Sequence, residues 1–112
     1  MSKQIAFEYD GKEYTLEYTR NTVRQMERRG FVADDIASKP MTVLPDLFAG
    51  AFLANHSQIK RAKIDEIYAC MRDKQKLIGA LTDMYNATIE TLLDEPEEGK
   101  NVSWTPNWET EA

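Results

Sequence analysis

The chain has very few of the residues on which metal sites and disulfides depend. Its 112 residues include one cysteine, Cys70, and one histidine, His56. A lone cysteine cannot form an internal disulfide, which fits a reducing compartment, and one residue of each kind cannot build a His/Cys metal cluster. We therefore predict no metal and no cofactor. We expect His56 to cap carbonyl groups at a helix end and Cys70 to be a small buried apolar residue.

Long apolar runs and catalytic motifs are also missing. No stretch approaches the ~20 apolar residues that a membrane helix needs, and the N-terminal MSKQIAFEYDG has no apolar segment typical of secretion signals. The sequence contains no phosphate-binding loop, dinucleotide fingerprint or nucleophile elbow. Carboxylates are frequent, but none is paired within an apolar run that would raise its pKa. We expect no catalytic residues and a protein that is not an enzyme.

Acidic residues are concentrated at the C-terminal end. Residues 94–112 hold six of the 19 acidic residues and one of the 14 basic ones, so the net charge of −5 belongs to this segment. The neutral remainder argues against a general affinity for nucleic acid. The segment also contains Pro, Gly, Asn and Ser, which predicts a flexible acidic tail over residues 95–112. Residues 1–94 are expected to form a single α+β domain.

The strongest local pattern lies near the N-terminus. The runs IAFEY and YTLEY alternate apolar with polar residues on either side of Asp10-Gly11. Such a pair favours a type I′ turn, in which both central residues have positive φ. A two-residue turn places Phe7 opposite Tyr14 and brings all six large apolar residues onto one face. We predict a two-stranded antiparallel hairpin with two open edges, which would favour strand addition and a homo-oligomer.

About four helices are expected to follow and to cover the hairpin, because apolar residues then recur at three- and four-residue spacing. Thr19 or Asn21 would cap the first helix and Gly30 would end it. Thr42 and Asp73 would cap the second and the last. The predicted ranges are 20–29, 42–55, 59–71 and 73–94, with the last either continuous or divided at Asn86-Ala87.

A basic stripe runs along the first predicted helix. Arg20, Arg24 and Arg28 recur at every fourth residue. Three interpretations stay open, in decreasing order of preference: a solvated face with Glu17 and Glu27 as local partners, a site for an acidic partner that includes the chain's own tail, and a phosphate-binding surface.

Two groups of large apolar residues are candidates for contact with a partner. Trp104 and Trp108 lie in the acidic tail, and tryptophan is a favoured anchor at interfaces. They would dock either on the chain's own body or on a partner. A groove for a partner helix would use Leu47, Phe48 and Phe52, or the apolar faces of the last helices. Those same three residues would more commonly be plain core.

Four segments together resemble a family of small phage-encoded proteins. They are FEYDGKEY (residues 7–14), TRNTVRQME (19–27), LFAGAF (47–52) and VSW (102–104). Members belong to the tail modules of long-tailed phages and prophages of Gram-positive bacteria, and they are treated as tail assembly chaperones. The resemblance extends over nearly the whole chain and brings no catalytic residue with it.

The resemblance implies a non-enzymatic chaperone that binds the tape measure protein and keeps it soluble and extended during tail-tube assembly. It also implies contact with the tail-tube protein, a location in the bacterial host cytoplasm and absence from the mature virion. The first alternative is a structural tail or connector subunit retained in the particle. The second is a small nucleic-acid-binding regulator that uses the arginine stripe. We expect no membrane partner.

Overall fold

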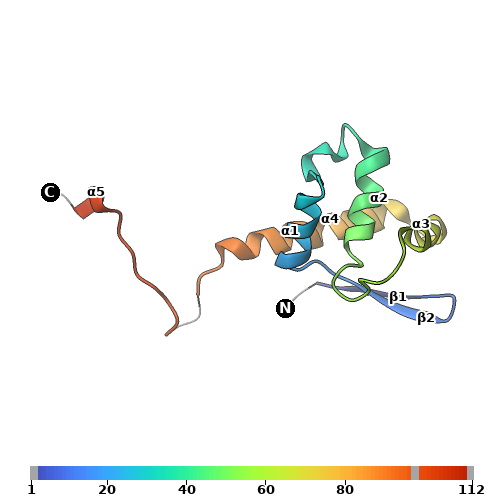
Figure 1. Cartoon of the computed structure of the whole chain (residues 1–112), viewed down its shortest axis with the longest axis horizontal. Helices are drawn as coiled ribbons and strands as arrows, with labels where there is room; N and C mark the ends of the chain where they lie inside the picture. The colour runs from blue at the N-terminus through green and yellow to red at the C-terminus, as the bar shows by residue number, and fades with distance from the viewer. Residues whose placement is uncertain (1–2, 97–98, 111–112) are drawn as a thin grey trace.

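A hairpin and four main helices make up the fold. The computed structural model describes residues 3–96 and 99–110, and the hairpin lies along one side of the helices (Figure 1). This arrangement is the α+β fold predicted from the sequence. In chain order the elements are β1 (Ile5–Tyr9), β2 (Lys12–Leu16), α1 (Arg20–Arg28), the 3-10 turn η1 (Ala33–Ile36), α2 (Pro40–Gly50), α3 (Arg61–Cys70), α4 (Lys74–Glu90), the 3-10 turn η2 (Thr91–Leu93) and α5 (Asn107–Thr110).

The hairpin has the predicted register. Phe7 lies opposite Tyr14 in the antiparallel pair, and their rings stack with centroids 5.4 Å apart. Asp10 and Gly11 have φ values of 52° and 79°, so both turn residues adopt the left-handed conformation that a type I′ turn requires. The ring of Phe52 covers this aromatic pair, with its centroid 5.9 Å from that of Tyr14.

The outer edge of β2 is covered, contrary to the expectation of two open edges. The N–H of Thr15 donates to His56 Nε2 at 3.0 Å, and the N–H of Glu17 donates to the carbonyl of Ala51 at 3.1 Å. Asn55 Nδ2 in turn donates to the carbonyl of Thr15 at 3.3 Å. The turns after α2 therefore supply partners that a third strand would otherwise supply. Since the sheet has two strands, β1 remains at its other edge.

The two ends of α1 follow its sequence signals, whereas the start of α2 does not. The side chain of Thr19 accepts the N–H of residue 22 in a capping box, and Gly30 ends the helix with φ at 94°. The expected start of α2 after Thr42 is wrong, because the helix begins at Pro40. Proline suits this first position, where its missing N–H would have no partner in the helix.

Helix α4 is continuous over 17 residues, so the division considered at Asn86 does not occur. The hydroxyl of Thr88 donates to the carbonyl of Met84 at 3.0 Å and to that of Tyr18 at 3.2 Å, which holds this turn of the helix against the body. Asp73 occupies the N-cap position as predicted. Its φ is 55° and its side chain makes no capping hydrogen bond, so it starts the helix without the expected side-chain contact.

The core forms where the hairpin meets α2, α3 and α4. The buried apolar residues all lie between Tyr14 and Tyr85. The hydroxyl of Tyr18 donates to the carbonyl of Leu47 at 2.6 Å, which ties the end of the hairpin to α2. The most deeply buried large side chains are those of Phe48, Phe52, Leu16, Leu47, Ile67 and Leu81.

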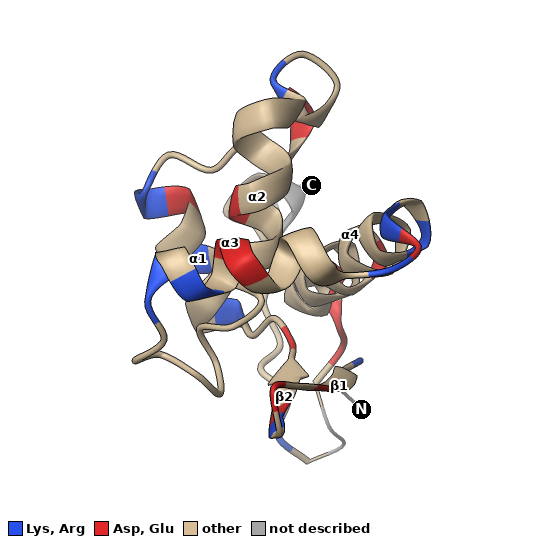
Figure 2. Cartoon of the chain, turned by 90° about the vertical axis from the view of Figure 1, so that its right-hand side faces the viewer, with Lys and Arg blue, Asp and Glu red and all other residues tan. Residues whose placement is uncertain are grey.

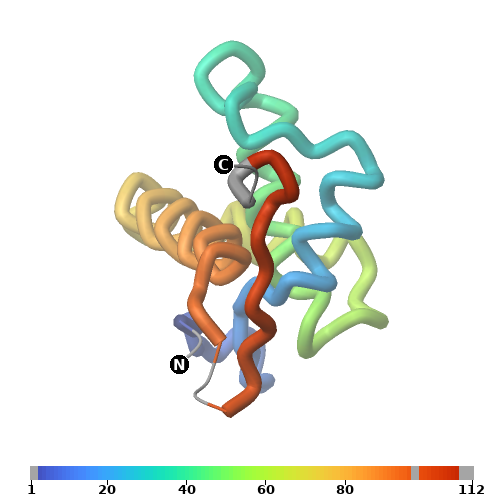
Figure 3. The backbone as a smooth tube through the Cα atoms, turned by 90° about the vertical axis from the view of Figure 1, so that its left-hand side faces the viewer, coloured from blue at the N-terminus to red at the C-terminus, as the bar shows by residue number. Residues whose placement is uncertain are grey.

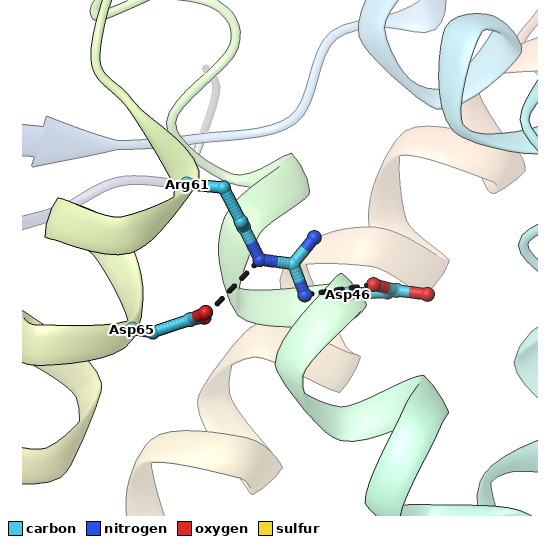
Figure 4. A network of polar contacts seen from close by, with 3 residues as sticks. All are labelled: Asp46, Arg61 and Asp65. Atoms are coloured by element: carbon cyan, nitrogen blue, oxygen red, sulfur yellow. Dashed lines mark hydrogen bonds and ion pairs between the residues drawn. The ribbon is translucent and has the colours of Figure 1, made fainter.

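A polar network joins α3 to α2 at the surface. Arg61, at the start of α3, contacts Asp46 at 2.9 Å and Asp65 at 3.1 Å (Figure 4). All three side chains are about half exposed, so solvent screens the pairs and each contributes little to stability. The network fixes the direction in which α3 leaves the preceding loop.

The C-terminal tail leads away from the helical body (Figure 1). Residues 101–106 form neither helix nor strand, and α5 is one short turn. Figure 3 views the molecule from this end, with the tail in front of the helices. The acidic residues at 97, 98 and 111 lie outside the described residues, and the flexibility of the tail stays a prediction. No helix within the described part of the chain is long and apolar enough to span a membrane.

Candidate functional site

The three residues predicted to line a groove on α2 lie in the core instead. Leu47, Phe48 and Phe52 have exposed fractions of 1%, 0% and 0%. They occupy the side of α2 and its following turn that faces the hairpin and α3, where the ring of Phe48 packs 5.1 Å from that of Tyr68. In this conformation they offer no surface to a partner. Their burial agrees with the alternative interpretation, in which they are core residues.

Exposed apolar side chains are concentrated at the other candidate position, the end of the last long helix. Ile89, Leu92 and Leu93 are 39%, 66% and 84% exposed, and Trp104 and Trp108 are 80% and 75% exposed. The body thus leaves both indole rings in solvent. Large apolar groups in this number are costly to expose unless they meet a partner. Among the described residues, only three further large apolar side chains are exposed, at Val32, Met41 and Val102.

A small hollow lies beside this end of α4, between it and α1. Its volume is about 130 Å³. Val23, Ile89 and Leu92 make it apolar, and Arg20 and Arg24 stand at its rim. We call this surface the α1–α4 edge; its remaining lining residues are Glu27 and Thr88.

The arginine stripe is divided between two roles. Arg20 donates through Nε to the hydroxyl of Thr91 at 2.8 Å and through Nη2 to the carbonyl of the same residue. Because Thr91 is the C-cap of α4, the guanidinium lies at the negative end of that helix dipole. Arg24 and Arg28 are exposed and form no ion pair with any carboxylate in residues 3–96 or 99–108.

The arginines of the stripe therefore form no ion pair with Glu17 or Glu27, the local partners expected for them. Glu17 instead accepts a hydrogen bond from Asn55 Nδ2 at 2.9 Å. On the face seen in Figure 2, acidic and basic residues lie interspersed along the helices. At the α1–α4 edge, Arg20 and Arg24 adjoin the exposed side chains of Ile89 and Leu92.

His56 has a structural position, though not the helix-end role predicted for it. Its Nε2 accepts the N–H of Thr15, which requires that nitrogen to be unprotonated. Burial, and secondarily the charge of Lys12, lower the pKa of His56. Its ring also packs 5.0 Å from that of Tyr14. No local pattern could reveal this contact, because Thr15 and His56 are 41 residues apart.

Cys70 is exposed, so its predicted burial is wrong. Ile64 and Ile67 form the buried face of α3, and Cys70 lies off that face beside the hairpin, with Sγ 4.0 Å from the hydroxyl of Tyr9. The same hydroxyl donates to Glu66 at 2.6 Å, and this hydrogen bond is the main cause that raises the pKa of Tyr9. The raised pKa means that the hydroxyl holds its proton and remains a hydrogen-bond donor, so the cluster fits a structural tie between hairpin and α3.

Two of the wider hollows adjoin α1, and a third, of about 630 Å³, lies around Lys12, His56 and Lys63. One, of about 480 Å³, lies on the other side of Arg20 and is lined in part by Lys3 and Asp94. The second, of about 410 Å³, lies between α1, α2 and the loop before α3, around Met26 and Arg61. No cluster of His, Cys, Asp and Glu suited to a metal ion occurs in the part of the chain that the structure describes.

Comparison with protein families matches residues 1–108 to a domain of unknown function, DUF5055. The chain belongs to this family. The matched region extends beyond the body and takes in the tail with Trp104 and Trp108. Searches of curated proteins and of solved structures returned no match. The family description names no function, so we infer function from the surface described above.

Proposed function

We propose that this chain is a non-enzymatic phage tail assembly chaperone that binds a helix of the tape measure protein at the α1–α4 edge. The observation that carries the proposal is the row of exposed apolar side chains at Ile89, Leu92 and Leu93, next to a hollow with an apolar floor. The resemblance of four segments to tail assembly chaperones supplies the identity of the partner.

The chemistry of the edge suits an amphipathic helix. Such a helix lays apolar residues at three- and four-residue spacing into a hydrophobic groove. Arg20 and Arg24 at the rim favour a partner with acidic residues beside its apolar stripe. The hollow is small, so each contact would be weak, and stable coating of a long helix would depend on many copies acting together. Weak individual contacts would also allow the chaperone to be displaced when tail-tube subunits assemble.

The test is co-expression with the tape measure protein of the same phage or prophage, followed by size-exclusion chromatography with light scattering. We expect otherwise insoluble tape measure protein to become soluble in a complex with many copies of this chain. The double variant Leu92→Ser/Leu93→Ser should lose this activity and keep its fold, because both side chains are exposed.

Met41→Ser is the matched control, since Met41 is equally exposed but lies at the start of α2. It should solubilise the tape measure protein as well as the unmodified chain does. Tape measure protein that stays in the pellet would contradict the proposal. Recovery of this chain from purified virions would favour the structural tail or connector subunit instead.

A further inference from the structure

The tail and the α1–α4 edge have complementary chemistry within one chain. The tail combines two exposed tryptophans with an excess of acidic residues. The edge combines an apolar floor with Arg20 and Arg24. Arg28 follows Arg24 one turn further along α1, and neither Arg24 nor Arg28 has a carboxylate partner among residues 3–96 and 99–108. Glu27 is the one acidic residue that lines the hollow. The edge therefore carries an excess of positive charge opposite a tail whose charge is negative.

The hollow at the edge matches one aromatic ring in size. Its volume is about 130 Å³, and an apolar cavity of roughly 150 Å³ accepts a benzene ring. Arg24 at the rim would lie over the face of an inserted indole, where a guanidinium is attracted by the ring quadrupole. A tryptophan in a tail that also carries acidic residues is thus an occupant that satisfies both the floor and the rim.

The path of the chain favours an edge on another molecule over the chain's own. The tail leads away from its own body and leaves Trp104 and Trp108 in solvent (Figure 1). It begins directly after η2, and Leu92 of that turn lines the edge. Because the donor segment and the acceptor surface lie at one end of the molecule, two copies related by a two-fold axis can exchange tails reciprocally.

We propose that the tail of one copy docks on the α1–α4 edge of a second copy, with Trp104 or Trp108 in the hollow and its acidic neighbours on the arginines. The contact produces a closed, reciprocal dimer. The tail would occupy the same edge that we propose for the tape measure helix, so the two occupants would compete for it. The dimer itself requires this chain alone, so it can be tested without the tape measure protein.

The test uses full-length variants in which one side of the contact is removed. The tail variant is Trp104→Ala/Trp108→Ala, and the edge variant is Arg24→Glu/Arg28→Glu. All four side chains are exposed, so both variants should melt like the unmodified chain. The mass of each is measured by light scattering over a range of concentrations, with reductant present because Cys70 is exposed and could form a disulfide between copies.

We expect the unmodified chain to dimerise with concentration, and each variant alone to associate at least about tenfold more weakly, as for loss of an interface anchor. An equimolar mixture of the two variants should restore dimers, because the intact tail of one meets the intact edge of the other. The charge-matched control Arg72→Glu/Lys76→Glu, at the far end of α4, should dimerise normally.

Two outcomes would overturn the proposal. The first is an unmodified chain that stays monomeric at every concentration. If the tryptophan emission of the Arg24→Glu/Arg28→Glu variant then differs from that of the unmodified chain, the tail docks on its own body instead. The second is a mixture of the variants that remains as monomeric as its components, since reciprocal exchange then has no part in any association.

Discussion

Replacing Tyr18 with phenylalanine removes one buried hydrogen bond and almost no volume. The hydroxyl of Tyr18 donates to the carbonyl of Leu47 at 2.6 Å. In a regular helix that carbonyl would accept the N–H of Ala51, but the N–H of Ala51 bonds to the carbonyl of Phe48 where α2 ends. Burial raises the pKa of Tyr18, so the hydroxyl keeps its proton through the neutral range.

The loss leaves a buried carbonyl without this donor, which costs about 1–3 kcal/mol. Since about 1 kcal/mol shifts the melting temperature of a domain of this size by roughly 4–8 °C, we expect Tyr18→Phe to lower it by roughly 4–24 °C. Thermal unfolding followed by circular dichroism measures the shift. Urea titration gives the free energy of unfolding independently.

Tyr14→Phe is the matched control for this change. Tyr14 is as deeply buried as Tyr18, at 3% against 4%, and its hydroxyl makes no hydrogen bond to residues 3–96 or 99–110. The same chemical change there should leave stability within about 0.5 kcal/mol of the unmodified chain. Equal melting temperatures for the two variants would show that the Tyr18 contact contributes nothing and would refute the reasoning.

Three further predictions concern other parts of the body. Because the pKa of His56 is lowered in the folded state, the free energy of unfolding should fall as the pH drops below about 6.5, and His56→Gln should flatten that part of a urea-titration series. Gly50→Ala should lower the free energy of unfolding by about 1 kcal/mol, because the added Cβ would lie within 3.0 Å of three atoms of buried Met26. This overpacking outweighs the gain in helix propensity. Thermal melts should show no such loss when Gly50→Ala is made in a Met26→Ala background. Cys70 should react with a thiol reagent in the folded protein at nearly the rate seen in denaturant, and a strongly protected thiol would contradict its exposed position.

The hairpin could be predicted because its determinants are adjacent in the sequence. Asp10 and Gly11 fix the turn, and strict alternation fixes which side chains face the core. The start of α1 is equally local, since the side chain of Thr19 bonds to the N–H three residues later. Both features could be predicted because each depends on interactions between residues only a few positions apart.

The position of the candidate groove could be predicted only as one of two alternatives, α2 or the last helices, because apolar spacing does not reveal what a helix face meets. Leu47 and Phe48 lie on α2, whereas Ile89 lies on α4 and Leu92 in the turn η2, and each pair belongs to a run of apolar residues at helical spacing. The first pair is covered by the hairpin and α3, whereas the second lies beyond the last buried residue, Tyr85. The cover on β2 was missed for the same reason, since it depends on residues about 40 positions away.

The restriction of the core to the stretch from Tyr14 to Tyr85 divides the chain into two parts with different tolerance to change. A substitution of a buried residue between Tyr14 and Tyr85 alters the packing of the core and so affects the stability of the whole body. A substitution or insertion after Leu93 changes no buried side chain among the described residues, so it can alter the binding properties of the tail without lowering the melting temperature of the body. The tail can therefore change in sequence without disturbing the packing of the body.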